Sequence, residues 1–225
     1  MLDTIELGPR EHARAAVIWM HGLGADGHDF EPIVPYLGLP PEAAVRIVFP
    51  HAPVRPVTVN GGMSMRAWYD IRALDIDRSQ DEAGIRASEA QITALVEREV
   101  ERGVAAERVV LAGFSQGAAM ALHVGLRLAT PPAGVLALSC YLLLPERLSS
   151  ERHPNNSSLP ILMAHGTVDP VVPLALGRAS RDRLQALGYQ PEWLEYPMGH
   201  EVNMEEIRMI GAWLRRLPAL APNAI

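Results

Sequence analysis

The sequence predicts an α/β protein with a mostly parallel central sheet and helices on both faces. Short apolar runs, which are typical of buried strands, recur along the chain and alternate with segments of helical character. No internal repeat or Gly/Ser-rich linker divides the 225 residues, and no large insertion is left over. We therefore expect a single domain over residues 1–225, without a separate lid domain.

Six apolar runs are the strand candidates, and two long segments are the clearest helix candidates. The strands are expected to end near Met20, Phe49, Gly113, Ser139, Ala164 and Tyr196. Residues 81–103 place apolar side chains on one helical stripe that stops at Gly103, and residues 203–217 show the same period. In such a sheet, functional side chains gather in the loops that follow the carboxyl ends of the strands.

The most informative stretch is the Gly-x-Ser-x-Gly pentapeptide at residues 113–117. It follows an apolar strand candidate and precedes a strong helix-forming segment, residues 118–122. A serine on such a sharp turn exposes its hydroxyl, and free N–H groups of the new helix point at whatever the serine attacks. We therefore expect Ser115 to be a nucleophile. The alternative is a tight turn that carries an ordinary surface serine.

A serine nucleophile needs a base and an acid, which in this class of hydrolase follow in the order acid, then histidine. Only His200 follows Asp169, which lies in the loop after the strand that ends near Ala164. We expect Asp169 to orient the imidazole and His200 to act as the base. Glu195, at the end of the strand that leads to His200, is the alternative acid.

Residues 22–27 fit the Gly-x-Gly-x-x-Gly pattern of dinucleotide-binding loops. Pro32 and Pro35 disfavour the helix that would grip a pyrophosphate, and the next strand ends in Pro50-His51 instead of a ribose-binding acid. The favoured interpretation is a loop that supplies a second backbone N–H opposite the nucleophile. We therefore expect no cofactor, and no His/Cys/Asp set in the sequence has metal-ligand spacing.

The composition limits which binding partners and which cellular compartment we expect for this protein. The net charge of −6 argues against nucleic acid, and the single cysteine, Cys140, fits a reducing compartment and an inert core position. The N-terminus lacks the basic start and apolar run of a signal peptide, and no apolar stretch reaches the ~18 residues of a membrane span. We expect a cytoplasmic protein.

Six segments, in order along the chain, resemble the phospholipase/carboxylesterase family, which includes the acyl-protein thioesterases. They are residues 20–27, 49–53, 68–70, 113–118, 165–173 and 199–200. The resemblance implies the α/β-hydrolase fold with Ser115, His200 and Asp169 as nucleophile, base and acid. It also implies the backbone N–H groups of Leu23 and Gln116 as the oxyanion hole.

The same resemblance places residues 56–70 beside the active site, where Met63, Met65 and Trp68 could line an acyl groove. Residues 140–144, which include Leu143, depart from the family pattern, in which a small residue is expected before the aromatic one, and this departure could alter the wall on the acyl side. The alternative is that these side chains simply fill the core.

The expected activity is hydrolysis of carboxylic esters with short to medium acyl chains through an acyl-enzyme. An acyl-protein thioesterase or lysophospholipase is the alternative, because it would use the same catalytic residues. A hydrolase-like scaffold that binds ligands without turnover is the alternative of another class. Oligomeric state stays open, although an exposed apolar rim beside the groove could support a homodimer.

Overall fold

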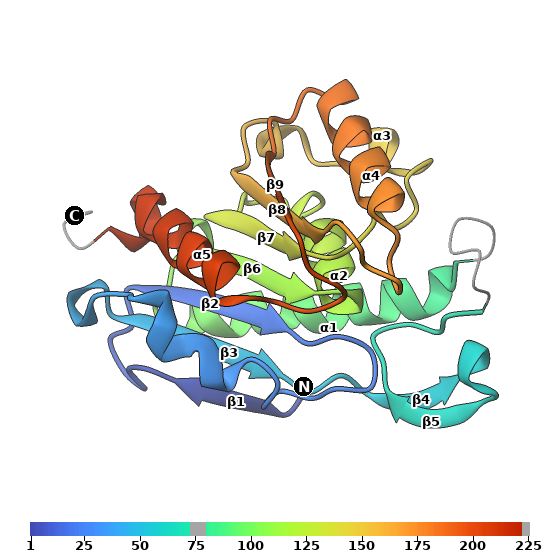
Figure 1. The fold of residues 1–225 in the computed structure, drawn as a ribbon. Coiled ribbons are helices and arrows are strands. Elements are labelled where there is room, and N and C mark those ends of the chain that lie inside the picture. Colours follow the sequence, from blue (N-terminus) through green and yellow to red (C-terminus); the bar gives the residue numbers. More distant parts are fainter. Residues whose placement is uncertain (73–79, 222–225) are drawn as a thin grey trace.

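The computed structural model describes residues 1–72 and 80–221 and is an α/β-hydrolase fold (Figure 1). Its central seven-stranded sheet has the order β1-β3-β2-β6-β7-β8-β9. Only β1 is antiparallel to its neighbour, and the other six strands are parallel. The strands of this sheet are β1 (Thr4–Leu7), β2 (Ala15–Met20), β3 (Val45–Pro50), β6 (Val109–Phe114), β7 (Gly134–Leu138), β8 (Ile161–Gly166) and β9 (Glu192–Tyr196).

The α-helices lie on both faces of the sheet, as the sequence predicts. They are α1 (Glu82–Glu101), α2 (Gln116–Gly125), α3 (Leu148–Glu151), α4 (Leu174–Ala186) and α5 (Met204–Arg216). One core packs α1 and α2 against the sheet, and the other packs α5 and the 3₁₀ helix Glu31–Leu37 against the opposite face (Figure 1). Alternate residues of β2 enter the two cores: Ile18 belongs to the first, and Val17 and Trp19 to the second.

Three short strands were not predicted from the sequence. β1 adds an antiparallel edge to the sheet. The strands β4 (Val54–Val57) and β5 (Met63–Arg66) form an antiparallel hairpin outside the main sheet. In Figure 1 this hairpin lies beyond the edge at which the parallel strands end, so it stands next to the loops that carry the candidate site.

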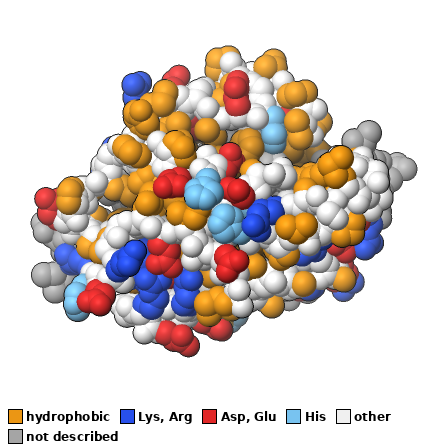
Figure 2. All heavy atoms as spheres, turned by 90° about the horizontal axis from the view of Figure 1, so that it is seen from below, with side chains coloured by type: hydrophobic (Ala, Val, Ile, Leu, Met, Phe, Trp, Pro, Cys, Tyr) orange, Lys and Arg blue, Asp and Glu red, His pale blue; other side chains and the backbone are white. Residues whose placement is uncertain are grey.

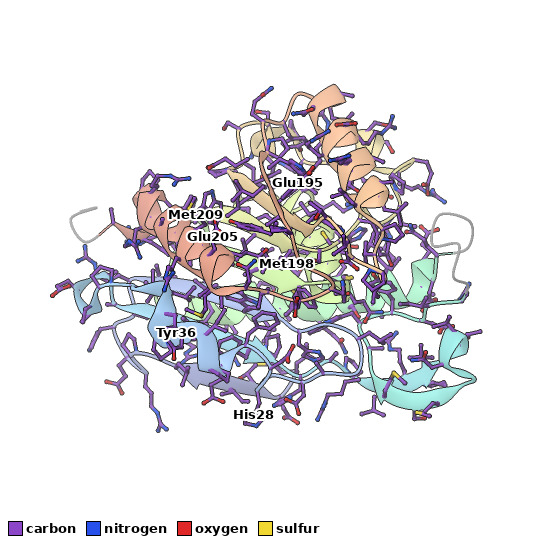
Figure 3. All side chains as sticks on the ribbon, in the orientation of Figure 1. His28, Tyr36, Glu195, Met198, Glu205 and Met209 are labelled. Carbon is purple, nitrogen blue, oxygen red and sulfur yellow. The ribbon has the colours of Figure 1, made fainter. Side chains whose placement is uncertain are left out.

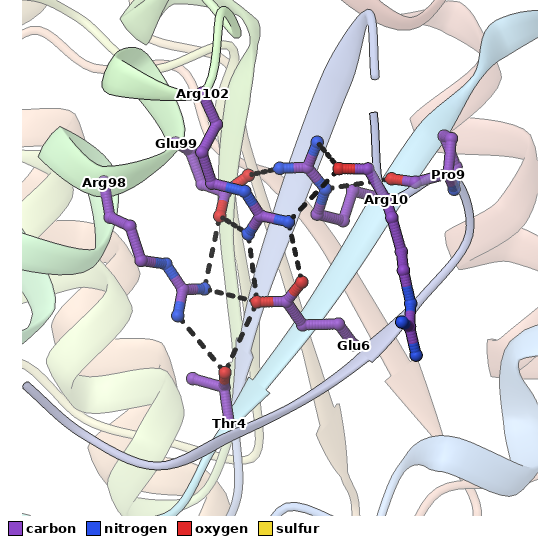
Figure 4. Close-up of polar contacts among 8 residues, drawn as sticks. Thr4, Glu6, Pro9, Arg10, Arg98, Glu99 and Arg102 are labelled. Carbon is purple, nitrogen blue, oxygen red and sulfur yellow. Dashed lines mark hydrogen bonds and ion pairs between the residues drawn. The ribbon is translucent and has the colours of Figure 1, made fainter. Parts of the chain in front are cut away.

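A network of charged side chains ties β1 and β3 to α1 (Figure 4). Arg46 of β3 and Glu99 of α1 form a buried ion pair at 2.7 Å, with side-chain exposures of 1% and 0%. Arg98 and Arg102 of α1 contact both Glu99 and Glu6 of β1. Removal of one buried partner would leave an uncompensated charge, so the network is costly to break. Because Glu6 belongs to it, we expect the network to hold β1 in place against α1.

Among the described residues, no helix combines the length and the apolar character that crossing a membrane would require.

Candidate active site

Ser115 lies on a sharp turn between β6 and α2. Its backbone has φ 54° and ψ −120°, a conformation that L-residues rarely adopt and that is often found at functional sites. The two flanking glycines permit the turn, because a Cβ on Gly113 would lie 2.4 Å from the Gly117 backbone. A Cβ on Gly117 would lie 2.2 Å from the Met20 carbonyl oxygen. The strand and the helix therefore pass so close to each other at this turn that only glycine fits at positions 113 and 117.

Ser115, His200 and Asp169 meet in one chain of hydrogen bonds. His200 Nε2 lies 2.9 Å from Ser115 Oγ, and His200 Nδ1 lies 2.7 Å from Asp169 Oδ2. The three residues come from the loops after β6, β8 and β9, which end at the same edge of the sheet. The imidazole also packs against the Phe114 ring at a centroid distance of 4.7 Å.

The loop that carries Asp169 also holds its side chain in place. Its side chain is fully buried, and Oδ1 accepts hydrogen bonds from the N–H groups of Val171 at 2.8 Å and Val172 at 2.9 Å. His165 supports the same turn, because its Nε2 donates to the Val172 carbonyl at 2.8 Å and lies 3.7 Å from Asp169 Oδ2. These contacts leave Oδ2 directed at His200.

Glu195, the alternative acid, is engaged elsewhere. Its carboxylate accepts two hydrogen bonds from Arg178, at 2.8 and 2.7 Å, and a third from Trp193 Nε1 at 2.7 Å. The Arg178 hydrogen bonds, and next the Trp193 bond, lower the pKa of Glu195 to about 2. Figure 3 shows Glu195 on β9. The geometry therefore favours Asp169 as the partner of His200.

The glycine-rich loop after β2 lies directly beside Ser115. A Cβ on Gly22 would lie 3.5 Å from Ser115 Cβ, which is van der Waals contact. The backbone of this loop therefore passes directly beside the serine side chain. Gln116, on the other side, is the first residue of α2, whose first N–H groups have no partner within the helix. Both Leu23 and Gln116 line the cavity next to Ser115.

The Gln116 side chain has a role that the sequence did not indicate. Its Oε1 accepts from the Trp68 N–H at 2.7 Å, and its Nε2 donates to the Tyr69 carbonyl at 2.8 Å. The side chain is therefore fixed to the segment that follows the β4–β5 hairpin.

A cavity of about 230 Å³ opens next to Ser115. Its walls come from the hairpin turn, from the segment after it, from the residue after Cys140 and from the Asp169 loop. The lining side chains other than Ser115, Leu23 and Gln116 are Val59, Asn60, Tyr69, Ile71, Tyr141, Val171 and Val172. Across this cavity wall, the hydroxyls of Tyr69 and Tyr141 lie 2.9 Å apart.

The four side chains predicted for the acyl groove do not line this cavity. Met63 is 65% exposed on β5, Met65 packs beside Gly24, and Trp68 and Leu143 are buried in the core. Trp68 instead donates its indole N–H to the His21 carbonyl at 2.9 Å, so it supports the loop beside Ser115. Tyr69, which follows Trp68, and Tyr141, two residues before Leu143, line the cavity instead.

The other histidines near the glycine-rich loop have local partners. His51 Nδ1 accepts from the Gly27 N–H at 3.1 Å, and the exposed His28, at the lower edge of Figure 3, pairs with Glu31 at 3.0 Å. Figure 2 shows acidic, histidine and arginine side chains interleaved on that face. No group of three or more potential metal ligands occurs within residues 1–72 and 80–221.

Most of the chain is similar to known hydrolases. The family model described as Phospholipase/Carboxylesterase matches residues 5–217. Acyl-protein thioesterase 1 of Neurospora crassa is 42% identical over 93% of this chain and 90% of its own length. Acyl-protein thioesterase 1 of Gibberella zeae is 39% identical over 90% of both chains.

Solved structures show the same similarity. Acyl-protein thioesterase 2 of Zea mays superimposes with a TM-score of 0.84 at 28% identity, covering 98% of this chain and all of that one. SOBER1 of Arabidopsis thaliana also gives 0.84, at 29% identity, over 90% of this chain and 98% of that one. These relatives support hydrolase activity for this protein, and the chain belongs to the phospholipase/carboxylesterase family.

Proposed function

We propose that this protein is a serine hydrolase that cleaves carboxylic esters of short to medium acyl chains through an acyl-enzyme. The observation that carries the proposal is the continuous hydrogen-bonded chain Ser115–His200–Asp169 at the mouth of an apolar cavity. Backbone N–H groups of Leu23 and Gln116 beside the serine complete the set of groups that acyl transfer requires.

The mechanism follows from the polarity of these hydrogen bonds. Because the Asp169 carboxylate can only accept, His200 Nδ1 carries the proton and Nε2 is free to accept one. Nε2 takes the Ser115 proton as Oγ attacks the acyl carbonyl carbon, and the two N–H groups stabilise the oxyanion. His200 then protonates the leaving group. In the second half, His200 activates water, which releases the acid and regenerates Ser115.

The small volume of the cavity supports a substrate with a short to medium acyl chain. Its volume of about 230 Å³ is below the several hundred Å³ of a site for a drug-sized ligand. Each methylene that enters contributes about 0.8 kcal/mol, which corresponds to about a fourfold gain in kcat/KM. We expect that gain for each added methylene until the cavity is filled, followed by a plateau or a decline.

Thioester hydrolysis is the second candidate, because relatives up to 42% identical are acyl-protein thioesterases. The two activities share every catalytic group. An acyl series from acetyl to palmitoyl, prepared both as p-nitrophenyl esters and as thioesters, separates them. A maximum at a long thioester would replace the ester proposal with the thioesterase one.

The experiment that tests the proposal is a burst assay with p-nitrophenyl butyrate, together with intact mass after a fluorophosphonate probe. We expect turnover and one adduct for the wild type, and a fall in kcat on the order of 10⁶-fold with no adduct for Ser115→Ala. Ser64→Ala, an exposed serine on the hairpin, is the matched control and should keep both. Folded wild-type protein without adduct or turnover would favour the binding-scaffold alternative.

A further inference from the structure

His21 is a buried histidine that the proposed mechanism does not use. It follows β2 directly, is 1% exposed, and uses both ring nitrogens in hydrogen bonds. Nδ1 lies 2.7 Å from the Gly22 carbonyl oxygen, and Nε2 lies 3.0 Å from the Ala52 backbone nitrogen. The ring therefore joins the end of β2 to the segment after β3.

These two partners admit one protonation state. The Ala52 N–H can only donate, so Nε2 must be the acceptor, and the Gly22 carbonyl can only accept, so Nδ1 must carry the proton. The imidazole is consequently neutral. Burial favours the same state, because it lowers the pKa of His21 to about 4 although the Gly22 hydrogen bond opposes the shift.

The His21 hydrogen bond fixes the orientation of one peptide group. The peptide between Gly22 and Leu23 is trans, so its C=O and N–H point in opposite directions. With the Gly22 carbonyl held toward the His21 ring, the Leu23 N–H must point away from that ring. We propose that His21 is a positioning residue that aims the Leu23 N–H at the oxyanion; this inference rests on the proposed function.

Hydrogen bonds around His21 hold the loop of residues 22–27 in one orientation. The Gly24 N–H donates to the Arg66 carbonyl at 2.9 Å, and the Arg66 guanidinium donates to the Ala52 carbonyl at 2.9 Å. Ala52 is thus bound on both sides, by His21 and by Arg66. These contacts fix the Ala52 N–H as a donor to His21 Nε2, and the ring is thereby held in place while Nδ1 donates to the Gly22 carbonyl. A peptide that is oriented before reaction avoids reorganisation in the transition state.

Two amide variants separate the two hydrogen bonds. In His21→Asn the amide nitrogen stands near the Nδ1 position and can still donate to Gly22. In His21→Gln the amide stands near the Nε2 position and can accept from Ala52, but the donor to Gly22 is lost. We measure kcat and KM with p-nitrophenyl butyrate, the Ki of a butylboronic acid that forms a tetrahedral adduct, and the thermal midpoint.

We expect His21→Gln to lower kcat about 100-fold and to raise the boronic acid Ki by a similar factor, with KM within about threefold. His21→Asn should lose about tenfold or less. Equal losses in the two variants, or losses expressed in KM, would overturn the inference and leave His21 as a structural residue. A wild-type protein without turnover would instead overturn the proposed function.

A measurement on the wild type covers the case in which neither variant folds. NMR with ¹⁵N-labelled histidine should show His21 as the neutral tautomer protonated at Nδ1 between about pH 5 and 8. The Leu23 amide proton should shift downfield when the boronic acid binds. A protonated Nε2, or an unmoved Leu23 amide in a protein that binds the inhibitor, would refute the proposal.

Discussion

Replacing Glu206 with glutamine is expected to stabilise the protein at alkaline pH. Glu206 is the third residue of α5 and is 1% exposed, and neither carboxyl oxygen makes a full hydrogen bond. Burial raises its pKa to about 8, and the Asn203 N–H that faces the carboxyl offsets this only in part. The nearby Tyr196 is also affected by burial, which together with the charge of Glu206 raises its pKa to about 12.

The size of the effect follows from proton linkage. Between the ordinary value of 4.5 and about 8, the folded state keeps a proton that the unfolded state has released, so stability falls as pH rises through this window. At about 1.4 kcal/mol per pKa unit, the loss is about 3 kcal/mol at pH 7 and about 5 kcal/mol above pH 8. Below pH 4.5 both states are protonated and the loss vanishes.

Urea unfolding at several pH values between 4.5 and 8.5 tests this reasoning. Glu206→Gln removes the titrating group and keeps the side-chain shape, so its advantage over the wild type should grow from about zero to several kcal/mol, with an unchanged m-value. Glu205→Gln is the matched control, because Glu205 is the exposed residue next to Glu206 on α5 (Figure 3). Its free energy of unfolding should differ from that of the wild type by less than about 0.5 kcal/mol at every pH. A constant difference between Glu206→Gln and the wild type would refute the assignment.

Three further outcomes are expected. Asp169→Asn should lower kcat about 10⁴-fold, whereas Glu195→Gln should stay within about threefold; the reverse order in steady-state assays would make Glu195 the acid. Gly177→Ala should destabilise by about 2 kcal/mol in urea unfolding, because its Cβ would lie 2.5 Å from His165 Nδ1, although Ala is normally better in a helix by about 1 kcal/mol. Cys140 should resist iodoacetamide in the native protein and react after denaturation, as judged by mass spectrometry, because burial raises the pKa of its thiol.

The parallel strands and the long helices could be predicted because their patterns are local. The six expected strand ends fall within a few residues of the ends of β2, β3, β6, β7, β8 and β9. The hairpin β4–β5 could not be predicted in the same way, since its strands have four residues each and its exposed side chains show no buried alternation. Such a strand pair depends on the loops that it contacts more than on its own sequence.

The cavity next to Ser115 shows a second reason why prediction from the sequence was incomplete. Residues from both segments that the family resemblance indicated, 56–70 and 140–144, line the cavity beside Ser115, but which side chain of a segment faces a cavity depends on backbone direction. Leu144 and Ser139, for example, adopt positive φ values of 46° and 50°, so the chain around Tyr141 turns sharply. Tyr141 consequently lines the cavity, and Leu143 turns into the core.

The histidines show what sequence order can determine and what it cannot. Order along the chain selects His200, because only one histidine follows both the serine and the loop aspartate. It gives no information about His21 or His165, because the hydrogen bonds of these two rings depend on the backbone groups that face them. His200 has a 15% exposed side chain between a carboxylate and a hydroxyl, so a proton can move through it. His21 is enclosed between one obligatory donor and one obligatory acceptor, which holds its proton at Nδ1 and suits it to orient a peptide instead of exchanging a proton.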